Sequence, residues 1–306
     1  AAGTAPEIGP LLRACGWAET VTAAAIGAPT AATAGSATTV TAQAPFAATA
    51  ELYTGMPLNL TGNPAADYPF IAAYTAGRVA TLTDSFSPVL DTATLLRIPP
   101  NVLYTPGSTA IPSLTAGFYV DGMLWSFTGA RGVNGLKVRS GGPGMLNFTM
   151  SGLFTGKTDT ALPTALYDGT SKPIWRDANS DGMSRALINR VRAGIANFTL
   201  DTNGTLTFPD NPNKAEAVDP PVIVRRRLTG SIDPIMASVA AQSIFADFRS
   251  MTPRILHFRF GITAGNRVAL TIPNAQYLNE TPGNRGELPT GEIPFFAQGQ
   301  DAGARL

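Results

Sequence analysis

The stretch Phe118-Tyr-Val-Asp121-Gly122-Met-Leu-Trp125-Ser-Phe127 decides the fold class of this 306-residue chain. Residues with a high propensity for strands flank an Asp-Gly pair on both sides. Asp-Gly favours the positive φ angles of a two-residue primed turn, which joins two antiparallel strands. The stretch therefore predicts a β-hairpin with Asp121 and Gly122 at its tip.

The rest of the chain extends this pattern. Short runs of β-branched and aromatic residues recur after residue 104 and are separated by Gly, Pro, Asn and Asp. The composition agrees, with 31 glycines, 25 prolines and 14% charged residues. One amphipathic helix is predicted over about residues 233–250, because Asp233 can cap it, Pro234 suits its first turn and apolar residues follow at every fourth position. We expect a mainly β protein with this single helix on its flank.

Residues 23–103 differ from the rest of the chain in composition and periodicity. The part from residue 20 to residue 50 is rich in Ala and Thr, carries almost no charge and lacks a helical stripe. Two runs, 78–86 and 92–98, have the character of strands. We interpret residues 23–103 as a partly extended embellishment of β and irregular structure that forms a small surface subdomain, and residues 1–22 and 104–306 as the main β domain.

Charge and cysteine content exclude several classes of protein. The 22 basic residues nearly balance the 21 acidic ones, whereas tight binding to nucleic acid needs an excess of positive charge. No apolar run reaches the roughly 20 residues of a membrane-spanning helix, and the first residues lack the features of a signal peptide. The single cysteine, Cys15, excludes an internal disulfide and a multi-cysteine zinc site. We expect no cofactor and no contact with a membrane.

The sequence contains little that indicates catalysis. Its one histidine, His257, shares a strand face with Ile255 and Arg259, opposite to Phe258, and we interpret it as an ordinary residue of a polar face. No nucleophile elbow, phosphate-binding loop, dinucleotide fingerprint or zinc motif is present. We expect no enzyme and name no catalytic residue. A hydrolase that uses two carboxylates needs no visible motif and stays an alternative.

One string resembles half of a calcium-binding loop. Asp177, Asn179 and Asp181 place oxygen ligands at alternate positions before Gly182. The twelfth position of such a loop is a bidentate Glu, and here it is Ile188. Because Asx residues and glycine are also typical of any surface turn, we favour a turn without metal.

The only basic run is Arg225-Arg226-Arg227. In a strand, neighbouring side chains point to opposite faces, so the three arginines do not form one patch. We favour salt bridges, including bridges to a neighbouring subunit, over phosphate binding.

Several segments, by their order and spacing, resemble the siphophage tail tube (major tail) proteins. They are Pro6-Glu7-x-Gly9-Pro10-Leu11-Leu12-Arg13-Ala14-Cys15-Gly16, Glu19-Thr20-Val21, Tyr104-Thr105-Pro106, Tyr119-x-Asp121-Gly122, Thr128-Gly129-Ala130-Arg131-Gly132, Asn147-Phe148-Thr149-Met150-Ser151-Gly152-Leu153, Leu162-Pro163, Gly261-x-Thr263-x-Gly265-Asn266 and Gly286–Phe296. The resemblance covers residues 5–22 and most of 104–297. It does not extend to residues 23–103, where members of the family have only a few residues.

This resemblance implies a β-sandwich or half-open barrel of the tail-tube type with one flanking helix. Six copies would form a ring whose sheets join into one barrel, and stacked rings would form the conduit for DNA ejection. The implied partners are further copies of the chain, a tape measure protein and a tail terminator, with double-stranded DNA passing non-specifically through the lumen. The implied location is the phage tail of the virion, after assembly in the cytoplasm of a bacterial host.

Subunit contacts and lumen can also be predicted. The candidate residues for subunit contacts are Arg131, Arg225, Arg227, Asp121 and Gly122. We expect an acidic or neutral lumen, because rings of Lys or Arg would bind the phosphates of passing DNA.

A binding module is the other alternative. A secreted β-sandwich could bind carbohydrate through a platform that includes Trp125 and Trp175, although aromatic residues on strands more often belong to the core. Self-assembly distinguishes the alternatives, because a binding module stays monomeric and a hydrolase turns over a substrate.

Overall fold

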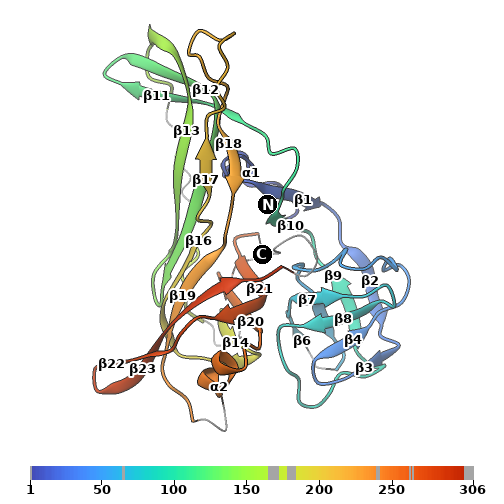
Figure 1. The fold of residues 1–306 in the computed structure, drawn as a ribbon. Coiled ribbons are helices and arrows are strands. Elements are labelled where there is room, and N and C mark those ends of the chain that lie inside the picture. The colour runs from blue at the N-terminus through green and yellow to red at the C-terminus, as the bar shows by residue number, and fades with distance from the viewer. Residues whose placement is uncertain are drawn as a thin grey trace.

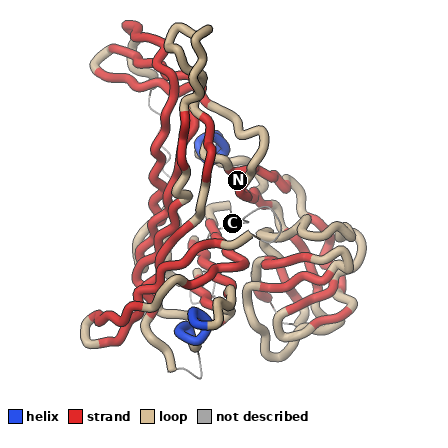
Figure 2. Tube along the Cα trace, in the orientation of Figure 1, coloured by secondary structure: helices blue, strands red, loops and turns tan. Residues whose placement is uncertain are grey.

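The computed structural model describes residues 2–63, 66–164, 172–177, 184–238, 242–261, 263 and 265–299 (Figure 1). Strands and loops make up almost all of this chain, and the two helices in the described residues, α1 (Gly9–Ala14) and α2 (Ile244–Arg249), are short (Figure 2). All strand pairs are antiparallel. The predicted mainly β class is confirmed.

The largest sheet, which we call the body sheet, has eleven strands. In sheet order they are β11 (Leu114–Val120), β12 (Met123–Arg139), β16 (Ile195–Asp201), β19 (Thr229–Pro234), β23 (Leu288–Ala297), β21 (Val268–Tyr277), β20 (Arg254–Phe260), β14 (Arg185–Ile188) and β15 (Val191–Arg192), with β13 (Gly144–Asp159) beside β12 and β22 (Thr281–Arg285) beside β23. The predicted hairpin is β11–β12, and Asp121 and Gly122 at its tip have φ angles of 47° and 78°.

Strand alternation gives the body sheet two different faces. One row of paired residues across β13, β12, β16, β19 and β23 is apolar and consists of Gly144, Val138, Phe198, Ile232 and Ile293. The adjacent row, on the opposite face, consists of Met145, Lys137, Thr199, Ser231 and Pro294. We call this second face the outer face.

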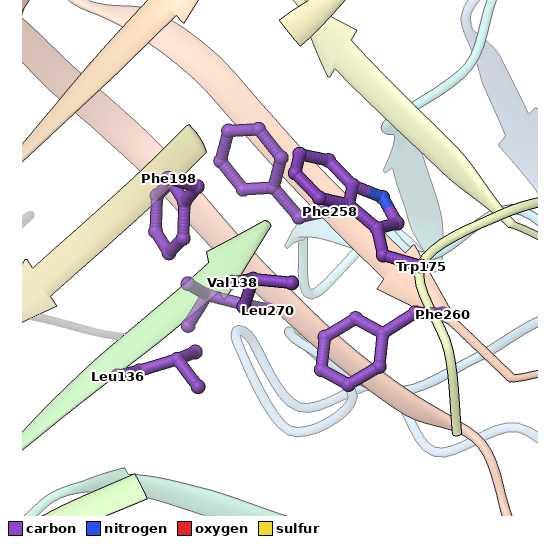
Figure 3. Close-up of a pocket in the computed structure, with 7 residues that line it drawn as sticks. All are labelled: Leu136, Val138, Trp175, Phe198, Phe258, Phe260 and Leu270. Carbon is purple, nitrogen blue, oxygen red and sulfur yellow. The ribbon is translucent and has the colours of Figure 1, made fainter. Parts of the chain in front are cut away.

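The apolar face of the body sheet curls onto itself. The ring of Phe198 in β16 lies 4.2 Å from that of Phe258 in β20 and 6.3 Å from that of Phe295 in β23, measured between centroids. A small space beside these rings is lined by Leu136, Val138, Trp175, Phe198, Phe258, Phe260 and Leu270 (Figure 3). Since this lining is wholly apolar, the space belongs to the hydrophobic core.

Residues 26–98, which we call the inserted domain, form two further sheets of four strands each. The first contains β2 (Ile26–Ala31), β9 (Leu95–Ile98), β5 (Asn59–Thr61) and β6 (Ala66–Asp67), and the second contains β3 (Ala34–Gly35), β4 (Thr39–Thr41), β8 (Val79–Leu82) and β7 (Ile71–Tyr74). Between them lies a separate hydrophobic core around Leu60, Leu82 and Ile98, which are fully buried. The predicted strands at 78–86 and 92–98 correspond to β8 and β9.

Two smaller sheets complete the fold. Strands β1 (Trp17–Thr22) and β10 (Asn101–Pro106) pair with each other and carry the chain into and out of the inserted domain. Strands β17 (Thr205–Thr207) and β18 (Val222–Arg225) form the other pair.

The predicted helix over 233–250 is wrong in its first part. Asp233 and Pro234 belong to β19, which pairs with β16 and β23, and α2 begins only at Ile244. Asp233 does not cap a helix: its Oδ1 atom accepts hydrogen bonds from the backbone N–H groups of Ala196 and Asn197 at 2.9 and 2.6 Å. Sheet pairing and the burial of Ile232 outweigh the helix-start preference of Asp233 and Pro234. Residues 239–241 of the predicted helix lie outside the described residues.

The buried row predicts a large difference between two residues of β23. Replacing Phe295, which is fully buried, by Ala should lower the free energy of unfolding by about 3–5 kcal/mol, through lost burial and a cavity. The matched control is Leu288→Ala on the same strand, where the side chain is 52% exposed and the change should stay within about 0.5 kcal/mol. Urea denaturation measures both, and equal losses would contradict this assignment of the core.

Candidate assembly surface

Three strands project from the body sheet as an arm. Strand β11 pairs with the first half of β12, and β13 pairs with β12 along nearly its whole length. Figure 1 shows these strands extending well beyond the curled part of the sheet, with the β11–β12 turn at the far end. We call residues 114–128 and 153–159 the arm.

The arm carries an aromatic cluster. The rings of Phe118, Trp125, Phe127 and Phe154 form successive contacts with centroids 5.6 to 5.9 Å apart, and Nζ of Lys157 lies 3.8 Å from the centre of the Trp125 ring. Phe118 is nevertheless 59% exposed and Phe154 is 43% exposed. Large exposed apolar side chains that gather in one place are typical of surfaces that bind another molecule.

Strand β13 is a free edge of the body sheet. In the described part of the chain its 16 residues pair only with β12, which leaves the hydrogen-bonding groups of its other side without a strand partner. Proteins usually protect such an edge with proline, charges or a very short strand. β13 contains no proline, and its only charged residues, Lys157 and Asp159, lie at its end. It can therefore accept a strand from another chain.

The outer face mixes small polar side chains with charged and apolar ones. Thr199 and Ser231 lie side by side on it, with their hydroxyl oxygens 2.9 Å apart. The next row contains Asn147, Gly135, Asp201, Thr229 and Phe296. By strand alternation the charges on this face in β12, β16, β19, β22 and β23 are Arg131, Lys137, Arg139, Arg285, Asp201, Asp233 and Glu292, so the two signs nearly balance. On β20 and β14 the same face carries Arg259 and Arg185, which the inserted domain covers.

The structure separates the predicted contact residues into two groups. Asp121 and Gly122 lie at the exposed tip of the arm. Arg131 lies nine residues further along β12, about 30 Å from the tip at about 3.3 Å per residue. Its guanidinium group donates hydrogen bonds to the carbonyl of Ile111 at 3.0 and 3.2 Å and to that of Pro221 at 2.8 Å. Arg131 thus ties two segments of its own chain together.

The three consecutive arginines do point in different directions. Arg226 turns inward and donates to the backbone carbonyls of Gly16 and Gly107, and burial lowers the pKa of Arg226. Arg225 and Arg227 are exposed, and the guanidinium of Arg227 lies 4.9 Å from the ring centre of Phe296. Arg225 and Arg227 remain candidates for contacts between subunits.

Two other predicted features find no support as ligand sites. Asn179 and Asp181 of the calcium candidate lie outside the described residues. Among the residues that the structure describes, no three His, Cys, Asp or Glu side chains come together as a metal site. Trp175 of the suggested carbohydrate platform is 6% exposed, and its ring packs edge-on against Phe258.

His257 lies on the polar face of β20, together with Arg259, and this face is buried. The side chain is fully buried where the body sheet meets the inserted domain. Its Nδ1 atom lies 2.9 Å from the hydroxyl of Thr271, and its ring packs 4.7 Å from that of Phe70. Burial, followed by the nearby charges of Arg259 and Arg185, lowers the pKa of His257 well below its ordinary range. Alternation along β20 could not show that another domain covers this face.

Comparison with known proteins adds no identification. No protein-family model and no curated protein sequence matches the chain. Among the described helices, none has the length and apolar character to span a membrane.

The aromatic cluster should hold the arm together. Trp125→Ala removes the ring contact with Phe154 and the contact with Lys157, which are each worth about 1 kcal/mol. We expect amide hydrogen exchange in the arm to become roughly tenfold faster or more, while β20 keeps its protection. Leu162→Ala is the control, since this residue lies just beyond β13 and is 66% exposed. An unchanged exchange rate in the Trp125 variant would contradict the role of the cluster.

Proposed function

We propose that this protein is a structural subunit that assembles with copies of itself into a tube, namely the tail tube of a long, non-contractile bacteriophage tail. The observation that carries the proposal is the free 16-residue edge of β13, which continues into the arm. An edge of this kind is satisfied when a strand of another subunit pairs with it. Repeated around a ring, such a head-to-tail contact closes the sheet and leaves no free edge.

The proposed ring has six copies, and its body sheets form the wall of the tube. The apolar face of each sheet is occupied by the core, and the inserted domain covers the outer face at β20 and β14. The outer face of β12, β16, β19 and β23 is therefore the part available to line the lumen. Its small hydroxyl groups and nearly balanced charges suit the passage of DNA, because they offer no strong binding site for phosphates. Rings stack into the conduit for DNA ejection, with the tape measure protein and the tail terminator as partners implied by the family resemblance.

The arm supplies a second contact between copies in this proposal. Phe118 and Phe154 are exposed in the isolated chain, and burial against a neighbour would remove their apolar surface from water. In this proposal Arg225 and Arg227, which are exposed, form ion pairs with a neighbouring subunit.

The alternatives receive less support. Asp67 and Asp84 lie close enough for Arg185 to engage both carboxylates, which makes them ion-pair partners and poor candidates for the acid and base of a hydrolase. Trp175 is buried in the core and cannot contribute to a carbohydrate-binding platform. These features favour a structural role over catalysis or glycan binding.

Negative-stain electron microscopy of the purified protein tests the proposal. We expect rings or tubes of the wild-type chain, and monomers of the double variant Met145→Lys/Thr149→Lys. Both side chains belong to β13, are exposed and lie outside the aromatic cluster of the arm, so the lysines should block the edge without harming the fold.

The matched control is Leu52→Lys/Val89→Lys on the inserted domain, where the exposures are 46% and 54%. This variant should assemble like the wild type. Wild-type protein that stays monomeric at high concentration would count against the tube, and an edge variant that assembles normally would rule out β13 as the contact.

A further inference from the structure

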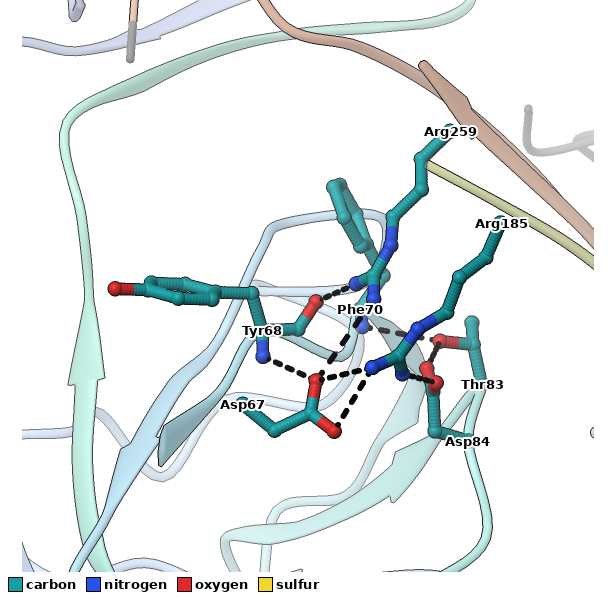
Figure 4. Close-up of polar contacts among 7 residues, drawn as sticks. All are labelled: Asp67, Tyr68, Phe70, Thr83, Asp84, Arg185 and Arg259. Atoms are coloured by element: carbon teal, nitrogen blue, oxygen red, sulfur yellow. Dashed lines mark hydrogen bonds and ion pairs between the residues drawn. The ribbon is translucent and has the colours of Figure 1, made fainter. Parts of the chain in front are cut away.

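The inserted domain meets the body through a buried group of charged side chains (Figure 4). Arg185 of β14 donates to Asp67 at 3.2 Å and also pairs with Asp84. Nη2 of Arg259 in β20 lies 3.8 Å from Asp67. Both arginines belong to the body and both carboxylates belong to the inserted domain, so every one of these ion pairs crosses between the two parts.

Hydrogen bonds to the backbone strengthen this contact. Arg259 donates to the carbonyl of Tyr68, and Nε of Arg190 donates to that of Leu82 at 3.0 Å. Within the inserted domain, the hydroxyl of Thr83 orients Asp84 through a hydrogen bond of 2.8 Å. The two hydrophobic cores remain separate clusters. Among the described residues, polar groups therefore hold the inserted domain in place, and no shared apolar core locks it there.

His257 lies inside this contact, where water is excluded. Its strand neighbour on the same face is Arg259, which pairs across the sheet with Arg185. Its Nε2 atom is buried and has no hydrogen-bond partner among the described residues. A proton on this nitrogen would create a third positive charge beside two arginines and a buried donor without an acceptor, and both effects are unfavourable.

The covalent connections permit movement. The inserted domain joins the body only through residues 23–25 and 99–100, which lie between the β1–β10 pair and the β2–β9 pair. The last pair of the first ladder is Thr22 with Asn101, and the first pair of the second is Ile26 with Ile98. Both linkers thus leave the body at the same point and can act as one hinge, with each ladder intact.

We propose that the inserted domain is a hinged unit, held against the body by a latch of Asp67, Asp84, Arg185 and Arg259, and that protonation of His257 releases the latch. The inference does not depend on the proposed tube, because it concerns a single chain. The latch keeps the domain closed at neutral pH and opens in mild acid.

The direction of the pH effect follows from linkage. In the closed form the pKa of His257 is far below the ordinary value of about 6.5, and in the open form the ring regains that value. Closure is therefore fully favoured above about pH 6.5. Below it, the ratio of open to closed molecules rises by up to about tenfold for each pH unit, until the low pKa of the closed form is reached.

Five other charged groups surround His257. They are Arg185 on β14, Arg192 on β15, Arg259 on β20, and Asp67 and Asp84 on the inserted domain, while Thr271 on β21 does not titrate. The arginines stay charged throughout the range. Replacing Asp84 by Asn should open the latch at neutral pH as well, since an ion-pair partner of Arg185 is lost.

A distance measurement between labelled cysteines tests the latch. Labels at Val89→Cys on the inserted domain and Phe245→Cys on α2 occupy exposed positions, and the buried Cys15 stays unlabelled because burial raises the pKa of its thiol to about 12. Between pH 6.5 and pH 5.5 we expect the population with a changed distance to rise about fivefold in an otherwise wild-type chain. In His257→Asn the population should not depend on pH over this interval.

Two controls make each outcome decisive. A label pair within the inserted domain, Leu52→Cys with Val89→Cys, should keep one distance throughout, and a change there would mean that the domain unfolds and would overturn the proposal. The proposal is also overturned if the distance across the hinge does not change in acid, or if the distance in His257→Asn changes with pH as it does in the wild type. If His257→Asn fails to fold, Asp84→Asn must show a raised open population at pH 7.5, and its absence would overturn the latch.

Discussion

The contact of Phe198 with Phe258 and Phe295 is the constraint on which the body of this protein depends. Strands β16 and β20 are separated in the sheet by β19, β23 and β21, so these rings can meet only if the sheet curls. The contact also decides which side chains face outward. Because side chains alternate along a strand, a slip of one residue would bury Thr199 and expose Phe198. The curl of the sheet, the choice of buried side chains and the composition of the outer face are therefore fixed together.

The same constraint explains what the chain leaves uncovered. Within the described residues no strand pairs with the outer edge of β13, and the aromatic rings of the arm pack against one another and against Lys157. An uncovered edge on β13 and an exposed aromatic surface on the arm are unfavourable for an isolated chain. Both become favourable contacts in an assembly, and this is the physical reason for proposing a self-assembling tube.

The inserted domain follows a different principle. It has its own core and reaches the body through ion pairs, hydrogen bonds to carbonyl groups and the ring contact of Phe70 with His257. Such a polar contact depends on charge and therefore responds to pH, whereas the Phe198 core does not. Because the two cores are separate, the inserted domain can move while the body keeps its fold.

Local chemistry in the sequence determined the mainly β class, the hairpin tip at Asp121 and Gly122 and the separation of Arg226 from Arg225 and Arg227. Each of these depends on neighbouring residues, whose turn and strand preferences act over short distances. Only the tertiary structure decided that Asp233 belongs to a strand, that His257 is buried and that β13 has a free edge. These depend on which distant strands pair and which domain covers which face, and periodicity within one segment carries no information on its partners.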